Sequence, residues 1–315
     1  MTTATPEQPL AERYPELDPT YAGLLDAARA AHLPPLTELT PEALRERVRT
    51  GDQLCAPGPD MLDVEDVLVD GSLVVRRYVP QRLRTGTVLV WFHGGGWVTG
   101  DLNYSDGFCR LLADSVGCEV RSVDYRLAPE HAFPAAVEDA VRAVRWTAEG
   151  DRRIVVAGDS AGGNLAAVVA QELRADRGVT IIGQVLVYAA LDHDVTRASY
   201  ERNVGMVLGP QEMGWFFDQY APNPTDRDSP RFAPVRAHSL VGLPPAVIAV
   251  AGHDPLHDEG VAYTESLRRA RIPVNLLDFG SLVHGFLRFT KPVSAAADAA
   301  AQIAVTTSAL VTTAS

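Results

Sequence analysis

Lysine is nearly absent from this sequence, and positive charge of any kind is in the minority. Lys291 is the only lysine among 28 basic residues, which face 40 aspartates and glutamates and leave a formal net charge of −12. Proteins that bind the phosphates of nucleic acids or an anionic membrane need clustered basic residues. The charge therefore argues against a nucleic-acid partner and against a membrane partner.

Cysteine and long apolar runs are also scarce. The three cysteines, Cys55, Cys109 and Cys118, are an odd number without the spacing of a metal site. This pattern indicates buried free thiols in a reducing compartment. Acidic residues and prolines stand where a signal peptide would have its apolar core, and no apolar run approaches the length of a membrane span. We therefore expect a soluble cytoplasmic protein.

What the sequence does contain is a regular alternation of strand and helix patterns. Its 315 residues, 46% of them hydrophobic, are enough to bury a large core. The alternation predicts an α/β fold, with a mostly parallel eight-stranded sheet covered by helices on both faces. The predicted strands are residues 64–69, 73–79, 87–92, 119–123, 154–157, 181–188, 246–251 and 274–279. The predicted helices are residues 20–31, 41–49, 104–116, 134–148, 165–173, 206–220, 259–270 and 294–310.

Two regions fall outside this alternation. Residues 1–52 are expected to be helical, with Thr40 as the N-cap of a helix that starts at Pro41. Residues from about 192 to 235 interrupt the pattern with an aromatic helical segment and a proline-rich loop. This insertion is either a core-facing element or part of a cap over a site at the sheet.

The sequence Gly158-Asp-Ser-Ala-Gly162 lies between a predicted buried strand and a predicted helix. Gly-x-Ser-x-Gly in this context is the pattern of a nucleophile elbow, a sharp turn that exposes the hydroxyl of Ser160 above the sheet. Glycines fit two residues before and after the serine because the neighbouring strand and helix leave no room for a Cβ atom. A plain strand-to-helix turn, with Ser160 capping the helix, is the alternative.

A serine nucleophile needs a base, and the base needs an acid that orients it. His284 follows the last predicted strand, and Asp254 follows the strand before it. Both should lie at the same sheet edge as Ser160, because parallel strands place their carboxyl ends together. Asp258 and Glu259, at the start of the next helix, and Asp192 and Asp194, after an earlier strand, are the rival acids, and we favour Asp254.

Three consecutive glycines after His93 provide the remaining part of a catalytic site. Backbone N–H groups of Gly94, Gly95 and Gly96, together with that of Ala161, can turn towards a developing oxyanion. A phosphate-binding loop is the alternative, but the Gly-Lys-Ser/Thr sequence that would complete it is missing.

His253 and His257 have the i, i+4 spacing of a pair of metal ligands. Pro255 lies between them, and no third ligand is near in the sequence, so a metal site is not expected. We predict neither a metal nor a cofactor.

With these motifs in view, the chain resembles the hormone-sensitive-lipase-like group, family IV, of bacterial α/β-hydrolase esterases. The resemblance covers about residues 60 to 290, and the serine–aspartate–histidine order is the one found in α/β-hydrolases. It rests on five motifs: His93-Gly-Gly-Gly-Trp97, Asp124-Tyr-Arg-Leu-Ala-Pro-Glu130 with Phe133-Pro-Ala-Ala136, Gly158-Asp-Ser-Ala-Gly-Gly163, Asp254-Pro-Leu256 and His284-Gly-Phe286.

The resemblance implies an α/β-hydrolase fold with a helical cap, and carboxylic esters of short to medium acyl length as substrates. It implies Ser160 as nucleophile, His284 as base and Asp254 as its partner, with Gly95, a neighbouring glycine and Ala161 at the oxyanion. Residues 1–52 and about 192–235 would form the cap, and 53–315 the catalytic domain that carries the insertion. Amide or lactone hydrolysis, or ligand binding on a hydrolase scaffold, are the alternatives. The small-molecule ester is the expected partner, and a homodimer is compatible with the sequence.

Overall fold

The computed structural model describes residues 8–313. Its centre is one eight-stranded sheet with the strand order β1-β2-β4-β3-β5-β6-β7-β8, in which β1–β2 and β2–β4 pair antiparallel and all other pairs are parallel. The predicted α/β-hydrolase sheet is thereby confirmed. The strands are β1 Met61–Val69, β2 Leu73–Pro80, β3 Val88–Phe92, β4 Glu119–Asp124, β5 Arg153–Asp159, β6 Thr180–Val187, β7 Ala246–His253 and β8 Val274–Val283.

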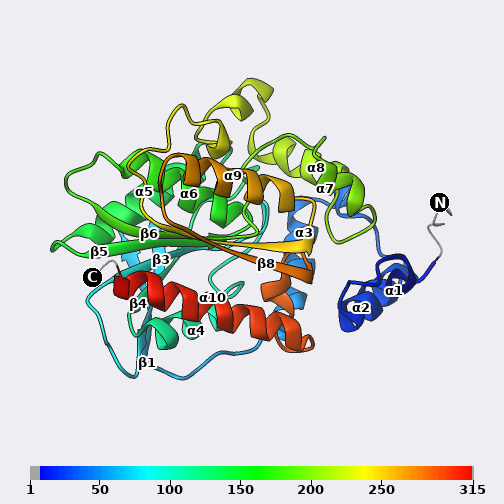
Figure 1. Cartoon of the computed structure of the whole chain (residues 1–315), viewed down its shortest axis with the longest axis horizontal. Helices are drawn as coiled ribbons and strands as arrows, with labels where there is room; N and C mark the ends of the chain where they lie inside the picture. The colour runs from blue at the N-terminus through cyan, green and yellow to red at the C-terminus, as the bar shows by residue number, and fades with distance from the viewer. Residues whose placement is uncertain (1–7, 314–315) are drawn as a thin grey trace.

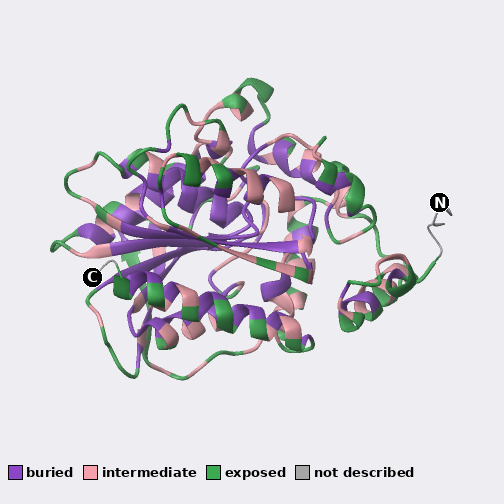
Figure 2. Ribbon diagram, viewed as in Figure 1, coloured by how far each residue is buried: buried purple, intermediate pink, exposed green. Residues whose placement is uncertain are grey.

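Helices cover both faces of the sheet (Figure 1). One face carries α4 (Asp106–Val116) and α10 (Ser294–Thr313), and the other carries α5 (Ala135–Ala148), α6 (Ala161–Leu173) and α9 (His257–Arg269). Each layer has its own apolar core against the sheet, and the central strands between them are almost fully buried (Figure 2). None of the helices within residues 8–313 is long and apolar enough to cross a lipid bilayer.

The remaining helices lie mostly at the end of the sheet where the parallel strands terminate (Figure 1). The α-helices are α1 Leu10–Arg13, α2 Pro19–Ala30, α3 Pro41–Thr50, α7 Ala198–Arg202 and α8 Pro210–Tyr220. The 3-10 turns are η1 Leu36–Glu38, η2 Gly51–Leu54, η3 Pro224–Asp228, η4 Pro234–Arg236 and η5 Phe286–Phe289.

Local sequence signals explain several of these boundaries. Asp70 and Gly71 both have a positive φ, of 49° and 70°, as a type I′ hairpin turn between β1 and β2 requires. The Thr40 hydroxyl oxygen accepts a hydrogen bond from the N–H of Ala43 at 3.3 Å, and Pro41 occupies the first position of α3. These two predictions are confirmed.

The insertion differs from its predicted structure. The helix expected over 206–220 begins only at Pro210, because Gly209 is extended. The five-residue α7 was not predicted, since it is too short to show a helical period. The helix after the serine starts at Ala161 instead of at 165, directly after the turn.

The N-terminal helices do not form one unit. Leu10 and Tyr21, from α1 and α2, are fully buried in the apolar cluster that contains Phe286, and the Tyr21 hydroxyl donates to the Phe286 carbonyl at 3.3 Å. Helix α3 instead packs over the other cluster through Leu44. Helices α1 and α2 therefore pack against a different apolar cluster from α3.

Of the three free thiols, Cys109 and Cys118 are buried as expected, while Cys55 is only half-buried. Burial raises the pKa of Cys118 to about 12 and that of Cys109 well above its usual range. Both thiols are therefore uncharged core residues.

Candidate active site

Ser160 occupies the turn between β5 and α6 with φ 52° and ψ −118°, a strained conformation for a residue with a side chain. A Cβ atom on Gly162 would overlap the carbonyl oxygen of Phe92, and one on Gly158 would overlap Gly162. The serine N–H donates to the Val187 carbonyl of β6 at 2.9 Å, which fixes the turn. The packing thus admits glycine alone at both flanking positions, as the elbow pattern predicts.

The structure brings the three predicted triad side chains together. Ser160 Oγ lies 3.0 Å from His284 Nε2, and His284 Nδ1 lies 2.8 Å from Asp254 Oδ2. Asp254 is fully buried, and its other carboxylate oxygen accepts the N–H of Leu256 at 2.8 Å. The serine side chain makes no capping hydrogen bond to α6, which removes the alternative interpretation of the turn.

Two of the rival acids, Asp258 and Asp192, have other partners. The Asp258 carboxylate accepts the Ser199 N–H at 2.9 Å and pairs with Arg202 at 2.6 Å. Asp192 pairs with two arginines, described below, and accepts the adjacent N–H of His193 at 2.9 Å. Neither carboxylate hydrogen-bonds to the His284 ring.

The glycine loop after β3 carries the predicted oxyanion donors Gly94, Gly95 and Gly96, and one of them needs a correction. The Gly94 N–H donates to the buried carboxylate of Asp159 at 2.8 Å and is therefore not available to a substrate, so its prediction as an oxyanion donor is wrong. Within the described residues, no hydrogen bond engages the N–H of Gly95 or Gly96, whose φ angles are 113° and 62°. Ala161 is the first residue of α6, so its N–H has no helical partner.

A buried polar and aromatic support holds this loop. The Tyr125 hydroxyl donates to the His93 carbonyl at 2.8 Å, and the Tyr125 and His93 rings stack with centroids 4.3 Å apart. The Ala128 N–H donates to the Trp97 carbonyl at 2.8 Å. Burial lowers the pKa of His93 to about 4, so its ring is neutral. Residues of the 124–130 motif therefore hold the glycine loop, called the oxyanion loop below, in place through these contacts.

Asp159 was not predicted as a site residue, although it lies inside the elbow. Its carboxylate accepts the Gly94 N–H and contacts the Tyr188 hydroxyl at 3.4 Å, and the Tyr188 ring packs edge-on against the His284 ring at 5.0 Å. Burial raises the pKa of Asp159 from 3.8 to about 6. The one signal in the sequence was a charged residue close after the apolar run Ile154–Ala157.

The raised pKa of Asp159 predicts a pH dependence of stability. The folded protein holds this proton more tightly than the unfolded chain, so the contribution of Asp159 to the free energy of unfolding falls as pH rises from about 4 to 6, by about 3 kcal/mol. Asp159→Asn cannot titrate, so its free energy of unfolding minus that of the unmodified protein should rise over this window. Denaturant unfolding of both proteins at several pH values measures the difference. A difference that stays constant with pH would contradict the assignment.

A cavity of about 360 Å³ opens beside Ser160 and His284. Its wall is mostly apolar and comes from the oxyanion loop, from α3 with its flanking turns, and from the insertion. The lining side chains outside the triad and the glycine loop include Leu36, Leu44, Arg47, Val48, Leu54, Tyr104, Val207, Leu208, Met213, Phe216, Arg288 and Phe289.

Two arginines hold α3 and η2 at this cavity, and neither was predicted from the sequence. Arg45 of α3 makes two hydrogen bonds to the Glu130 carboxylate, at 2.7 and 2.6 Å. Arg288, four residues after His284, donates to the Val48 carbonyl at 2.9 Å and pairs with Asp52 at 2.7 Å. The Arg45 clamp is a side chain of α3 that binds Glu130. The Arg288 clamp is a side chain of η5 that binds the end of α3 and η2.

Known proteins share this architecture over most of the chain. The profile of a family described as alpha/beta hydrolase fold matches residues 89–288. The chain belongs to this family, in its hormone-sensitive-lipase-like esterase group. Esterase LipI of Mycobacterium tuberculosis is 40% identical over 306 residues, which cover 92% of this chain and 93% of LipI. The carboxylic ester hydrolase LipN of the same organism is 44% identical over 249 residues, which cover 73% of this chain and 66% of LipN.

Solved structures agree with these relatives. The hyperthermophilic esterase of Pyrobaculum calidifontis is 35% identical and superposes with a TM-score of 0.87, covering 94% of this chain and 99% of that one. The relatives and structural neighbours are named as esterases, and this protein is a carboxylic ester hydrolase.

Proposed function

We propose that this enzyme hydrolyses esters of short to medium acyl length through an acyl-enzyme intermediate on Ser160. The observation that carries the proposal is the continuous hydrogen-bonded series from Ser160 through His284 to Asp254, with distances of 3.0 and 2.8 Å. Serine becomes nucleophilic only when a base accepts its proton, and this series supplies the base and the acid that orients it.

In the first half of the reaction, Ser160 Oγ attacks the ester carbonyl while His284 Nε2 takes the hydroxyl proton. Asp254 keeps the proton of the ring on Nδ1 and stabilises the imidazolium that forms. The negative charge on the carbonyl oxygen is met by N–H groups of Gly95, Gly96 and Ala161, which need no reorganisation because the loop is already folded. The alcohol then leaves with the proton held by His284.

In the second half, water enters the vacated position and His284 takes one of its protons. The resulting hydroxide attacks the acyl group, and the oxyanion again forms at the same N–H groups. Ser160 regains its proton from His284 as the carboxylic acid leaves. Every step uses groups of this chain and water.

We also propose that α3 with its flanking turns and residues of about 192–235 form the cap that selects the acyl group. The cavity carries Leu44 and Val48 from the first segment and Leu208, Met213 and Phe216 from the second. Apolar walls favour an acyl chain, since each methylene buried contributes about 0.8 kcal/mol, or about fourfold in binding. The Arg45 and Arg288 clamps hold the first of these walls in place.

A series of nitrophenyl esters tests this function. From acetate to butyrate, kcat/KM should rise by up to about fourfold per methylene while the cavity fills. It should stop rising for octanoate and fall for palmitate, because a cavity of about 360 Å³ is at the lower end of the range for small-molecule sites. Butyryl nitroanilide is the matched amide and should be turned over far more slowly. Equal rates on ester and anilide, or no turnover of any ester, would overturn the proposal.

A further inference from the structure

The short helix α7, at the start of the insertion, contacts the loop that carries Asp254. The Ser199 hydroxyl donates to the Pro255 carbonyl at 2.5 Å, and its N–H donates to Asp258 at 2.9 Å. One turn later, the side-chain amide of Asn203 donates to the Asp254 carbonyl at 3.0 Å. Ser199 is fully buried and Asn203 is 2% exposed, so water does not compete for these bonds.

This loop needs external support. It joins β7 to α9 in three residues, and its middle residue, Pro255, has no N–H to donate. Asp254 must keep one carboxylate oxygen at the Nδ1 atom of His284, and its other oxygen is already bonded to the Leu256 N–H. The Asp254 carbonyl accepts the N–H of His257 at 3.1 Å, and α7 adds the Asn203 bond to the same carbonyl and the Ser199 bond to the Pro255 carbonyl.

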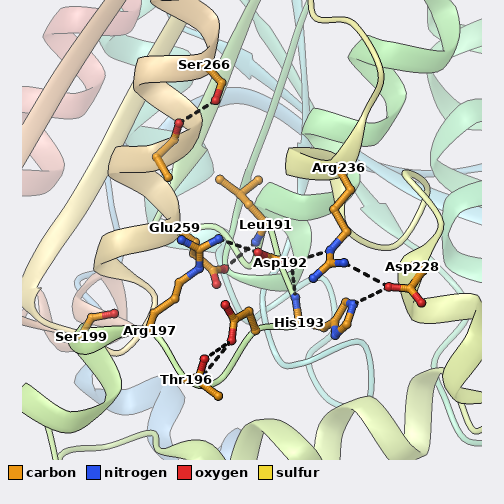
Figure 3. Close-up of polar contacts among 12 residues, drawn as sticks. Leu191, Asp192, His193, Thr196, Arg197, Ser199, Asp228, Arg236, Glu259 and Ser266 are labelled. Atoms are coloured by element: carbon orange, nitrogen blue, oxygen red, sulfur yellow. Dashed lines mark hydrogen bonds and ion pairs between the residues drawn. The ribbon is translucent and has the colours of Figure 1, made fainter.

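An ion-pair network at Asp192 joins the residue before α7 to the far end of the insertion. Figure 3 shows the buried Asp192 carboxylate between Arg197, immediately before α7, and Arg236 in η4 at the other end of the insertion. The two contacts are 2.5 and 2.9 Å long. Burial alone would raise the pKa of Asp192, but its bonds to the two arginines outweigh burial and hold the pKa below its usual range. Asp192 is therefore a charged structural link.

Helix α9, which follows the Asp254 loop, is hydrogen-bonded to the start of the insertion. The carboxylate of Glu259 in α9 accepts the Leu191 N–H at 2.6 Å (Figure 3). The start of the insertion is thus bonded to α9 through Leu191, and α7 is bonded to the loop before α9.

A continuous path also leads from α7 to the cavity wall. The Met206 N–H donates to the Asn203 carbonyl at 3.2 Å, and Val207 and Leu208 then line the cavity beside Ser160. Asn203 therefore lies between the wall that contacts substrate and the backbone of Asp254.

We propose that Asn203 and Ser199 are positioning residues for the triad acid. They hold the Asp254 backbone so that its carboxylate stays within hydrogen-bond distance of His284. The insertion is then part of the catalytic framework as well as a cover for the cavity. The inference rests on the proposed function, in which Asp254 orients His284.

Kinetics of Asn203→Ala and Ser199→Ala test the inference. Because a misplaced catalytic group can cost about 100-fold in rate, Asn203→Ala should lower kcat on nitrophenyl butyrate by about ten- to 100-fold, while KM stays within about threefold. Ser199→Ala should cause a smaller loss of the same kind. The matched control is Ser266→Ala on α9, which also removes a hydroxyl donated to a backbone carbonyl, that of Ala262 at 2.9 Å. This control should keep its kcat.

The decisive measurement is the effect of Asn203→Ala on kcat in the Asp254→Asn variant. If Asn203 acts through Asp254, then Asn203→Ala should lower the residual kcat of Asp254→Asn by less than about twofold, because the interaction that it serves has already been removed. An effect of Asn203 on kcat that does not pass through Asp254 would give an equal loss in both backgrounds and would overturn the inference.

Two controls separate the positioning role from a loss of folding and from a failure of the proposed function. Activity is expressed per folded molecule from the unfolding curve of each variant, and Ser199→Ala carries the test if Asn203→Ala does not fold. Full kcat in the folded variant tested, alongside an inactive Asp254→Asn, would refute the positioning role and leave the proposed function standing. An active Asp254→Asn would instead refute the proposed role of Asp254 and the inference that rests on it.

Discussion

Replacing Ser160 with alanine should abolish turnover of nitrophenyl butyrate and leave the fold unchanged. The serine hydroxyl lies 3.0 Å from His284 Nε2, and the proposed mechanism uses it as the nucleophile. Loss of a triad nucleophile costs about 10⁶-fold in kcat, and what remains comes from binding and the oxyanion hole. Stability should change by less than about 1 kcal/mol, because alanine keeps the same backbone and removes a side chain that caps no helix.

Two measurements check this expectation. The unfolding midpoint of Ser160→Ala establishes that the variant is folded, and stopped assays establish its residual rate. A serine-directed organophosphate should add one label to the unmodified enzyme, at Ser160, and none to the variant. A folded variant with near-normal kcat, or labelling at another serine, would refute Ser160 as the nucleophile.

Asp254→Asn should lower kcat by about 10⁴-fold. The buried Asp254 carboxylate accepts a hydrogen bond from His284 Nδ1, so that Nε2 is left to take the proton of Ser160. An asparagine in this position can donate its own N–H to Nδ1, which traps the imidazole in the tautomer that cannot act as a base towards serine. The side-chain volume is nearly unchanged, so the loss should appear in kcat and little in folding.

Asp258→Asn and Asp192→Asn are the matched controls. Asp258→Asn loses the partly exposed ion pair with Arg202, which contributes about 1 kcal/mol or less. Asp192→Asn breaks contacts with two arginines around a buried carboxylate and should lower stability by more, about 1 to 3 kcal/mol, with kcat reduced less than about tenfold. Measuring kcat and the unfolding midpoint of all three variants separates the two effects. An active Asp254→Asn beside an inactive Asp192→Asn would reverse the assignment.

The sequence by itself determined the elements whose signals are local. A glycine two residues on either side of Ser160, Asp70-Gly71 between two strands, and Thr40 before Pro41 each depend on the conformation of a few adjacent residues. The order of strands and helices followed from hydrophobic periodicity, and the carboxyl edge of a parallel sheet then placed Ser160 and the two loops after the last strands together. These signals were enough to predict the fold and the residues that meet at the site.

Only the tertiary structure decided which groups these residues contact. The Gly94 N–H is taken by Asp159, Arg45 reaches Glu130, and Asn203 reaches the backbone of Asp254 across 51 positions of the sequence. A hydrogen bond between distant residues leaves no period and no spacing in the chain, and a five-residue helix such as α7 is too short to show one. Which N–H groups are left for an oxyanion, and what holds the triad acid, are therefore properties of the packed structure.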